Sequence, residues 1–357
     1  MPQYTQNSST HRKGQSSDEV TWDLTPFILE GQDQFLPDGL RVWSLSNTTI
    51  HQVPEVFYGG HVGLTSQIPM RRTAISKTRT IVKLPHGLAN NGLDRRTNLV
   101  DPIAVQETIY QGRKFLMHEQ DEGMQFLNAQ ELEKNNYLRL LTGEFSVAKE
   151  MYNPSPKYPA EIECKLASYG KSSILCEFLM RSPDVSHPIA VVKDKGVLVS
   201  DSFTEVCPLP EIWKERFGSY YKKADIWFEP FATPSDMICR GAQVKPFVVT
   251  VPGRDEGTYG YVVPSMLLQY CLDALGDHIS RNKIHCEANT ESLFLKNASY
   301  HITAFNRVAD TLTVELWDDD AYSDGVCFNI LKSGNSVFQS RIQFYSYGDL
   351  QLQDSHA

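Results

Sequence analysis

The sequence has no apolar run long enough to cross a membrane, no cysteine pair at C-x-x-C spacing and no large cluster of basic residues. A membrane-spanning helix needs about 20 apolar residues, so no transmembrane segment is expected. The seven cysteines are odd in number and widely spaced, which argues against a zinc site built on paired cysteines and favours reduced, buried thiols. The formal net charge of −9 argues against nucleic acid as a partner, because phosphate-binding surfaces concentrate Lys and Arg.

Common catalytic signatures are also missing: there is no nucleophile elbow, phosphate loop or dinucleotide-binding fingerprint, and no cofactor or metal is expected. Residues 1–19 are rich in Ser, Thr, Gln and Asn and have no apolar stretch. We therefore expect a disordered tail rather than a signal peptide, and a cytoplasmic protein. Aromatic residues, in contrast, are plentiful, with 17 Phe, 16 Tyr and 5 Trp. This composition fits a strand-rich fold with an apolar ligand site.

In the first part of the chain, residues 107–117 resemble a strand that leads into an Asp-Glu-Gly segment at 121–123. A helix is expected over 129–151, because apolar residues recur there at helical spacing. Strand-like runs follow at 158–166, 172–180 and 189–199.

The second part of the chain has the same expected order. A strand over 246–251 leads into Asp-Glu-Gly at 255–257, and an amphipathic helix is expected over 264–279. Strands are then expected at 293–295, 299–305, 312–317, 326–331 and 337–345. Because the two Asp-Glu-Gly segments lie about a domain length apart, this order indicates a duplicated domain rather than short solenoid repeats.

This arrangement resembles the hotdog fold, in which a curved antiparallel sheet wraps one central helix. It is similar in particular to the 4-hydroxybenzoyl-CoA thioesterase-like and acyl-ACP thioesterase superfamily, whose members carry a D-x-D-x-x-G-H-x-N-N-type segment just before that helix. In the first part, Glu119 and Asp121 fall on the paired acids and Asn128 on the last Asn, while Gln125 stands in place of the His. In the second part, Asp255 takes the acid position and Tyr261 stands in place of the His.

The resemblance implies an α+β fold with two fused hotdog domains, expected at 105–218 and 219–350. An N-terminal extension of uncertain fold would occupy residues 20–104. A tandem hotdog already contains the pairing that single hotdog proteins obtain by dimerising, so we expect a monomer, with a homodimer as the alternative.

The resemblance also implies a carboxylate that acts as base or nucleophile, and a helix N-terminus that polarises the thioester carbonyl. The catalytic candidates are Asp121, Asp255, Glu122, Glu256 and His118. The candidates for substrate contacts are Glu119, Gln125, Asn128, Tyr259, Tyr261 and His61. Acids in front of a helix also cap it and offset its dipole, so a purely structural role for either Asp-Glu-Gly segment is an equally ordinary interpretation.

Three functions stay open. The first is hydrolysis or release of an acyl group from CoA or from an acyl carrier protein. The second is cyclisation, isomerisation or dehydration of a polyketide- or terpenoid-like metabolite, in which Tyr259 and Tyr261 would matter more than an acid. A dehydratase is the minor interpretation, because Gly63 and Pro69 do not follow His61 at the spacing of the dehydratase motif. The third is binding of an apolar ligand without catalysis.

Overall fold

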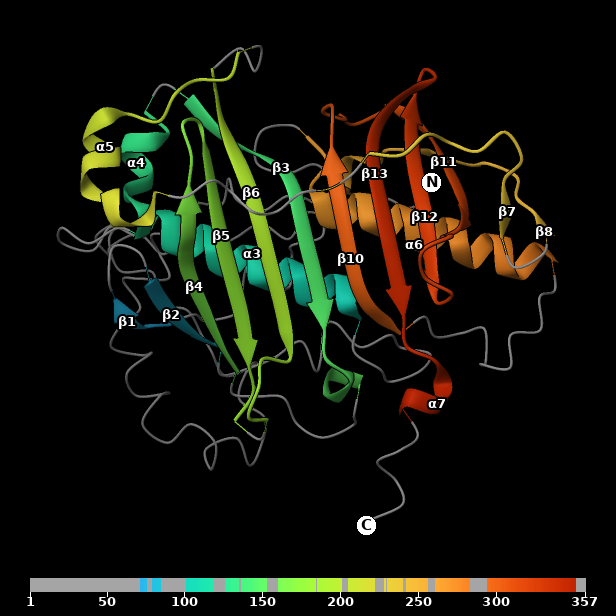
Figure 1. The fold of residues 1–357 in the computed structure, drawn as a ribbon, viewed down its shortest axis with the longest axis horizontal. Helices are drawn as coiled ribbons and strands as arrows, with labels where there is room; N and C mark the ends of the chain where they lie inside the picture. The colour runs from blue at the N-terminus through green and yellow to red at the C-terminus, as the bar shows by residue number, and fades with distance from the viewer. Residues whose placement is uncertain are drawn as a thin grey trace, which may run out of the picture.

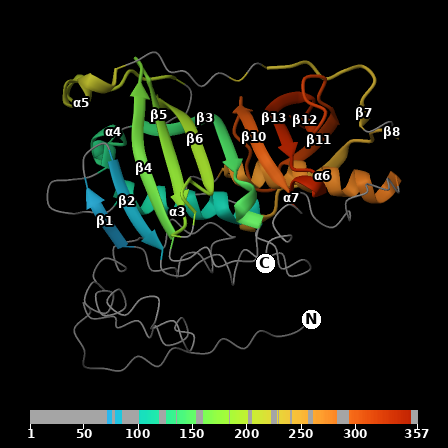
Figure 2. The same cartoon turned by 60° about the horizontal axis from the view of Figure 1, so that its bottom comes forward.

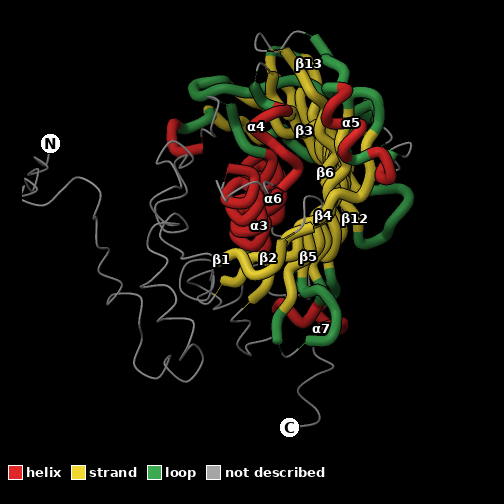
Figure 3. Tube along the Cα trace, turned by 90° about the vertical axis from the view of Figure 1, so that its left-hand side faces the viewer, coloured by secondary structure: helices red, strands yellow, loops and turns green. Residues whose placement is uncertain are grey.

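The computed structural model describes residues 71–75, 79–84, 101–118, 126–134, 136–152, 160–183, 185–200, 205–221, 228, 230–239, 242–255, 261–282 and 294–350. Within these residues one antiparallel sheet of 11 strands curves around two long helices, α3 and α6, which lie against the same face (Figures 1 and 3). None of the described helices is both long and apolar enough to span a membrane.

The two halves of the sheet have the same chain order. The first half contains β1 (Arg71–Ile75), β2 (Arg79–Leu84), α3 (Pro102–His118), β3 (Asn136–Val147), β4 (Ala160–Tyr169), β5 (Ser173–Arg181) and β6 (Ala190–Ser200). The second half contains β9 (Phe247–Thr250), α6 (Pro264–Asn282), β10 (Leu295–Ile302), β11 (Thr311–Asp318), β12 (Gly325–Lys332) and β13 (Asn335–Phe344). Each half therefore has a long helix followed by four strands, and the helix is preceded by two strands in the first half and by one in the second.

The order of strands across the sheet is β1-β2-β4-β5-β6-β3-β10-β13-β12-β11-β9. The second half repeats the order of the first in reverse, as two copies related by a two-fold axis do, and β3 and β10 join them. Shorter elements are β7 (Ile238–Cys239), β8 (Ala242–Gln243), α4 (Ala129–Leu132), α5 (Glu211–Arg216), α7 (Tyr347–Leu350), and the 3₁₀ helices η6 (Phe126–Asn128), η7 (Lys149–Tyr152), η8 (Gly218–Tyr220) and η9 (Gly253–Asp255). Figure 2 shows α3 and α6 crossing under the strands of their own halves.

The prediction of a strand over 107–117 is wrong, because this segment is part of α3. Asp101 and Pro102 mark the start of the helix: the Asp101 carboxylate accepts a hydrogen bond of 2.9 Å from the backbone N–H of Ile103, and proline is favoured in a first turn. The prediction of a helix over 129–151 is also wrong. Only α4 and the start of η7 are helical there. Between them lies β3, because hydrogen-bonded ladders on both of its edges outweigh the local helical spacing.

The first half of the sheet begins before residue 105, the predicted domain boundary. β2 pairs antiparallel with β4 from Arg79 opposite Lys165 to Leu84 opposite Ala160, so part of the expected N-terminal extension belongs to the sheet. The segment 121–123 therefore follows the first central helix, whereas Asp255 precedes the second. The two Asp-Glu-Gly segments therefore differ in their position in the chain order of the two halves.

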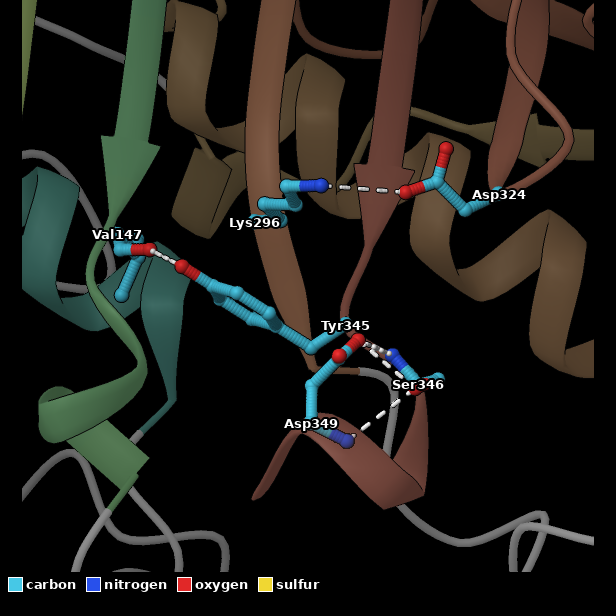
Figure 4. Close-up of polar contacts among 6 residues, drawn as sticks. All are labelled: Val147, Lys296, Asp324, Tyr345, Ser346 and Asp349. Atoms are coloured by element: carbon cyan, nitrogen blue, oxygen red, sulfur yellow. Dashed lines mark hydrogen bonds and ion pairs between the residues drawn. The ribbon is translucent and has the colours of Figure 1, made fainter. Parts of the chain in front are cut away.

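The two halves also exchange hydrogen bonds at the end of the molecule where α7 lies. The Tyr345 hydroxyl donates to the carbonyl of Val147, at 2.9 Å, and the Tyr152 hydroxyl donates to the carbonyl of Leu295, at 2.6 Å. Lys296 pairs with Asp324 beside them, at 3.4 Å, as Figure 4 shows. Because each tyrosine bonds to a strand of the opposite half, this end of the β3–β10 junction is fixed by side chains as well as by the ladder.

We expect Gly143→Ala to lower the free energy of unfolding by about 1–3 kcal/mol, as overpacking of a core does. A Cβ at this position would overlap the Tyr300 hydroxyl and lie 2.8 Å from Asp194 Oδ1. Chemical denaturation of both variants is the measurement, with Gly276→Ala in α6 as the control. A Cβ at Gly276 meets nothing within 4 Å, so this control should be neutral or stabilising by up to about 1 kcal/mol. Equal effects of the two substitutions would contradict the prediction.

Candidate functional site

The two central helices begin close to each other beneath the β3–β10 junction. The hydroxyl of Ser265, in the first turn of α6, donates a hydrogen bond to the carboxylate of Glu107 in α3. Both helix N-termini therefore point towards the middle of the sheet, and the positive ends of their dipoles lie in the same region.

Asp255 is the last residue of η9, precedes α6 in the chain and is only 3% exposed. Its Oδ2 accepts a hydrogen bond of 2.5 Å from the hydroxyl of Tyr270, a buried residue of α6. The phenol thus fixes the orientation of the carboxylate beside the first turns of the helix. Asp255 precedes this helix in the chain, in the predicted order, whereas Glu256 and Tyr259 lie outside the described residues.

The turn between β10 and β11 holds both ends of the loop that carries Asp255. Val251 exchanges backbone hydrogen bonds with Ala309 and Asp310, at 3.0 and 2.9 Å, and the N–H of Val262 donates to the carbonyl of Asn306, at 2.8 Å. The Asn306 side chain is 2% exposed, and within the described part of the chain neither its amide nitrogen nor its oxygen has a hydrogen-bond partner. Such a group costs about 1–3 kcal/mol until a partner satisfies it, so Asn306 is a candidate ligand contact.

Tyr261 belongs to a stack of four side chains at the same place. Its ring stacks on Phe305, with centroids 4.2 Å apart, and its hydroxyl accepts a hydrogen bond of 3.0 Å from Arg307. The Arg139 guanidinium, from β3 of the first half, lies 4.1 Å from the centroid of the Phe305 ring on its other side. We call this set of Arg139, Phe305, Tyr261 and Arg307 the arginine–aromatic stack.

The remaining predicted site residues lie elsewhere or outside the described structure. Asn128 precedes α4 with a φ of 50°, and its amide donates to Glu131, at 2.5 Å. His118 is the last residue of α3. The residues Glu119, Asp121, Glu122, Gln125 and His61 lie outside the described residues. The long helix that was predicted to follow Asp121 is not present, because α4 has only four residues there, and in the chain Asp121 comes after α3.

A buried cluster that the sequence prediction missed lies where α3 meets the junction. Tyr110 of α3, Asp194 of β6 and Tyr300 of β10 converge here. The Tyr300 hydroxyl donates to Asp194 Oδ1 at 2.9 Å, the Tyr110 hydroxyl lies 3.3 Å from the same oxygen, and the two hydroxyls are 2.6 Å apart. Gly143 of β3 lies between Asp194 and Tyr300 and leaves room for both.

The cluster lies in the core, and Asp194 is 2% exposed. Burial raises the pKa of Asp194 from 3.8 to about 6, although the nearby Arg113 and the bonds from the two phenols oppose the shift. Within the described residues Asp194 Oδ2 and Gln106 Oε1 have no hydrogen-bond partner. An ionised Asp194 carboxylate can only accept hydrogen bonds, as Gln106 Oε1 does, whereas a protonated Asp194 carboxyl also provides a donor. The sequence signal that could have identified Asp194 is the alternation of residues between the two faces of β6, because Asp194 falls on a buried position of that strand.

We predict that Asp194 makes stability depend on pH between its usual pKa of 3.8 and its folded value of about 6. The folded protein binds this proton more tightly than the unfolded chain does. The contribution of Asp194 to the free energy of unfolding is therefore largest below the unfolded pKa and falls as pH rises through that range, by on the order of 3 kcal/mol.

The reference variant is Asp194→Asn, whose side-chain amide cannot ionise. The free energy of unfolding of the parent minus that of the variant, from urea titrations at several pH values, should decrease across this range and be flat above it. A difference that grows with pH would show that the charged form of Asp194 stabilises the fold, contrary to the prediction.

No protein-family model matches the sequence, and a search of curated proteins finds no match. Solved structures do match. A Lactobacillus plantarum protein assigned as an oleoyl thioesterase has a TM-score of 0.55 and 11% identity, over 77% of this chain and 98% of that one. The 12:0-ACP thioesterase of Umbellularia californica also has a TM-score of 0.55 and 11% identity, over 76% of this chain and 99% of that one. At this identity the likeness establishes the fold. The chain therefore has the α+β tandem hotdog fold of these two structures, with two hotdog domains fused through one continuous sheet.

Proposed function

We propose that the protein hydrolyses the thioester of an acyl group carried by CoA or by an acyl carrier protein, with Asp255 as the catalytic carboxylate. One observation carries the proposal: a buried acid that precedes the 19-residue central helix of the second hotdog in the chain accepts a hydrogen bond from Tyr270 of that helix. The fold supports it, since both similar structures are named as thioesterases of fatty acyl groups.

The reaction requires a base and a stabilised oxyanion. In the proposed step Asp255 takes a proton from a water molecule while the water oxygen bonds to the thioester carbonyl carbon, and the carbonyl electron pair moves onto its oxygen. The N-terminal end of α6 stabilises that negative charge. When the carbonyl re-forms, the C–S bond breaks and the thiolate takes up the proton, so a carboxylic acid and a thiol are released.

The bond from Tyr270 gives the carboxylate one orientation. Oδ2 is held by the phenol, so Oδ1 is the oxygen that would accept the proton of the attacking water. A base must lie within hydrogen-bond reach of the proton that it removes, and a fixed carboxylate keeps that geometry from one turnover to the next. Tyr270 is in this proposal a positioning residue.

We expect Asp255→Asn to reduce thiol release from a panel of short, long and aromatic acyl-CoAs by about 100-fold or more, as loss of a general base does. Tyr270→Phe should reduce kcat by a smaller factor, because the carboxylate is kept but loses its fixed orientation. Asp324→Asn is the control, since Asp324 pairs with Lys296 on the surface. Melting temperatures of all three variants check that the fold is intact.

The same assay separates the alternatives. Parent-like hydrolysis by Asp255→Asn would contradict the role of Asp255, and loss of activity in Asp121→Asn instead would place the reaction in the first half. Folded parent protein that releases no thiol from any acyl-CoA would contradict the proposed reaction. Conversion of a bound apolar metabolite would then indicate a cyclase or isomerase, and its recovery unchanged would indicate a binding protein.

A further inference from the structure

Arg139 carries a positive charge at the junction and forms no ion pair with a carboxylate among the described residues. Its Nε and Nη2 atoms are inaccessible to solvent and have no hydrogen-bond partner within the described residues. Its guanidinium instead stacks on the ring of Phe305. Burial lowers the pKa of Arg139, although the nearby Tyr261 opposes that shift. Because a desolvated cation without acceptors is costly, this position favours the arrival of an anion.

A second guanidinium completes the arginine–aromatic stack on the opposite side. Arg307 lies 5.1 Å from the centroid of the Tyr261 ring and is exposed. The stack thus presents one cation from the first half, Arg139, and one from the second half, Arg307, with two aromatic rings between them. Tyr261 follows Asp255 on the segment that leads into α6, and the turn between β10 and β11 bonds to both ends of that segment, so the stack and the proposed reaction site belong to one part of the second half.

The titratable groups next to the arginine–aromatic stack do not neutralise its positive charge. The carboxylate of Asp310 accepts hydrogen bonds from the backbone N–H of Arg307, at 2.7 Å, and from the ammonium group of Lys332, at 2.6 Å, so Lys332 offsets its charge. Burial and the nearby Arg139 lower the pKa of His301, which is therefore neutral at neutral pH. In a chain with a net charge of −9, the stack is a locally cationic site.

We infer that the arginine–aromatic stack binds the phosphate at the end of the pantetheine arm of the substrate. This inference rests on the proposed thioester hydrolysis. The acyl chain and the thioester are uncharged, whereas CoA and the prosthetic group of a carrier protein share a phosphate at the far end of the arm from the sulfur. Guanidinium groups match phosphate oxygens with paired N–H donors and are weakly hydrated, which suits a partly buried site.

Asn306 supplies an independent observation for the same ligand. It lies between Phe305 and Arg307 in the sequence, and its buried side-chain amide has both a donor and an acceptor without a partner in the described structure. The pantetheine arm contains two amide groups between the thiol and the phosphate. An amide of the arm can satisfy the donor and the acceptor of Asn306 together, so the stack and Asn306 would hold neighbouring parts of one molecule.

The test is calorimetric binding of 4′-phosphopantetheine, pantetheine and CoA to the full chain and to Arg139→Gln and Arg307→Gln. The parent should bind phosphopantetheine more tightly than pantetheine, and each variant should weaken phosphopantetheine binding by about 10- to 100-fold while leaving pantetheine unchanged. Arg341→Gln is the matched control, because Arg341 also stacks on an aromatic ring, Phe231, at 5.2 Å, and should bind all three ligands like the parent.

Arg307 is exposed, so its variant keeps the test valid if Arg139→Gln does not fold. Equal parent affinities for phosphopantetheine and pantetheine, or a phosphate preference that survives both substitutions, would overturn the inference. Binding is measured without turnover, so phosphate-dependent binding by a protein that hydrolyses nothing would refute only the proposed reaction. Tighter binding of CoA than of phosphopantetheine would identify CoA as the source of the phosphate, and equal binding would identify the arm shared with carrier proteins.

Discussion

The antiparallel pairing of β3 with β10 is the constraint on which the centre of the molecule depends. It places Gly143 opposite Tyr300, and because Gly143 has no side chain, the Tyr300 hydroxyl can reach across β3 to Asp194 on β6. A shift of one residue in this register would turn Tyr300 to the other face of the sheet and remove the cluster. The same pairing brings Arg139, on β3, over Phe305, which follows β10 in the chain.

Two buried carboxylates serve different purposes in this arrangement. Asp194 lies in the core between α3 and the sheet, where burial favours its protonated form and two phenols bind it from opposite halves. It joins the halves and has no role in the proposed reaction. Asp255 lies at the end of η9, in the connection between β9 and α6, and accepts a hydrogen bond from a phenol of its own half. The difference follows from the elements that carry them, since a strand fixes a side chain in the core and a loop can present one to a ligand.

The sequence predicted the second half well, because α6 begins at Pro264 and its apolar residues recur at helical spacing between clear strands. The first half was predicted poorly, because β3 contains apolar residues at a spacing that also fits a helix, and only its two ladders make it a strand. At the site, the sequence motif identified Asp255 and Tyr261. It did not identify Arg139 and Asn306, because these residues are distant in sequence from the motif and come near it only through the strand pairing and the turn after β10.

The direction of the two helix dipoles explains why only one of the two fused hotdog domains would supply a reacting carboxylate. In the second half Asp255 precedes α6 in the chain, whose N-terminal end is the positive end of a helix dipole, whereas in the first half residues 121–123 come after α3 in the chain. A helix N-terminus can stabilise an oxyanion, and in the proposed reaction that of α6 does so. In this proposal the first half contributes a cation, Arg139, instead of a carboxylate. A site that takes its carboxylate from one half and its cation from the other requires that the two halves stay in one chain or keep the same β3–β10 register.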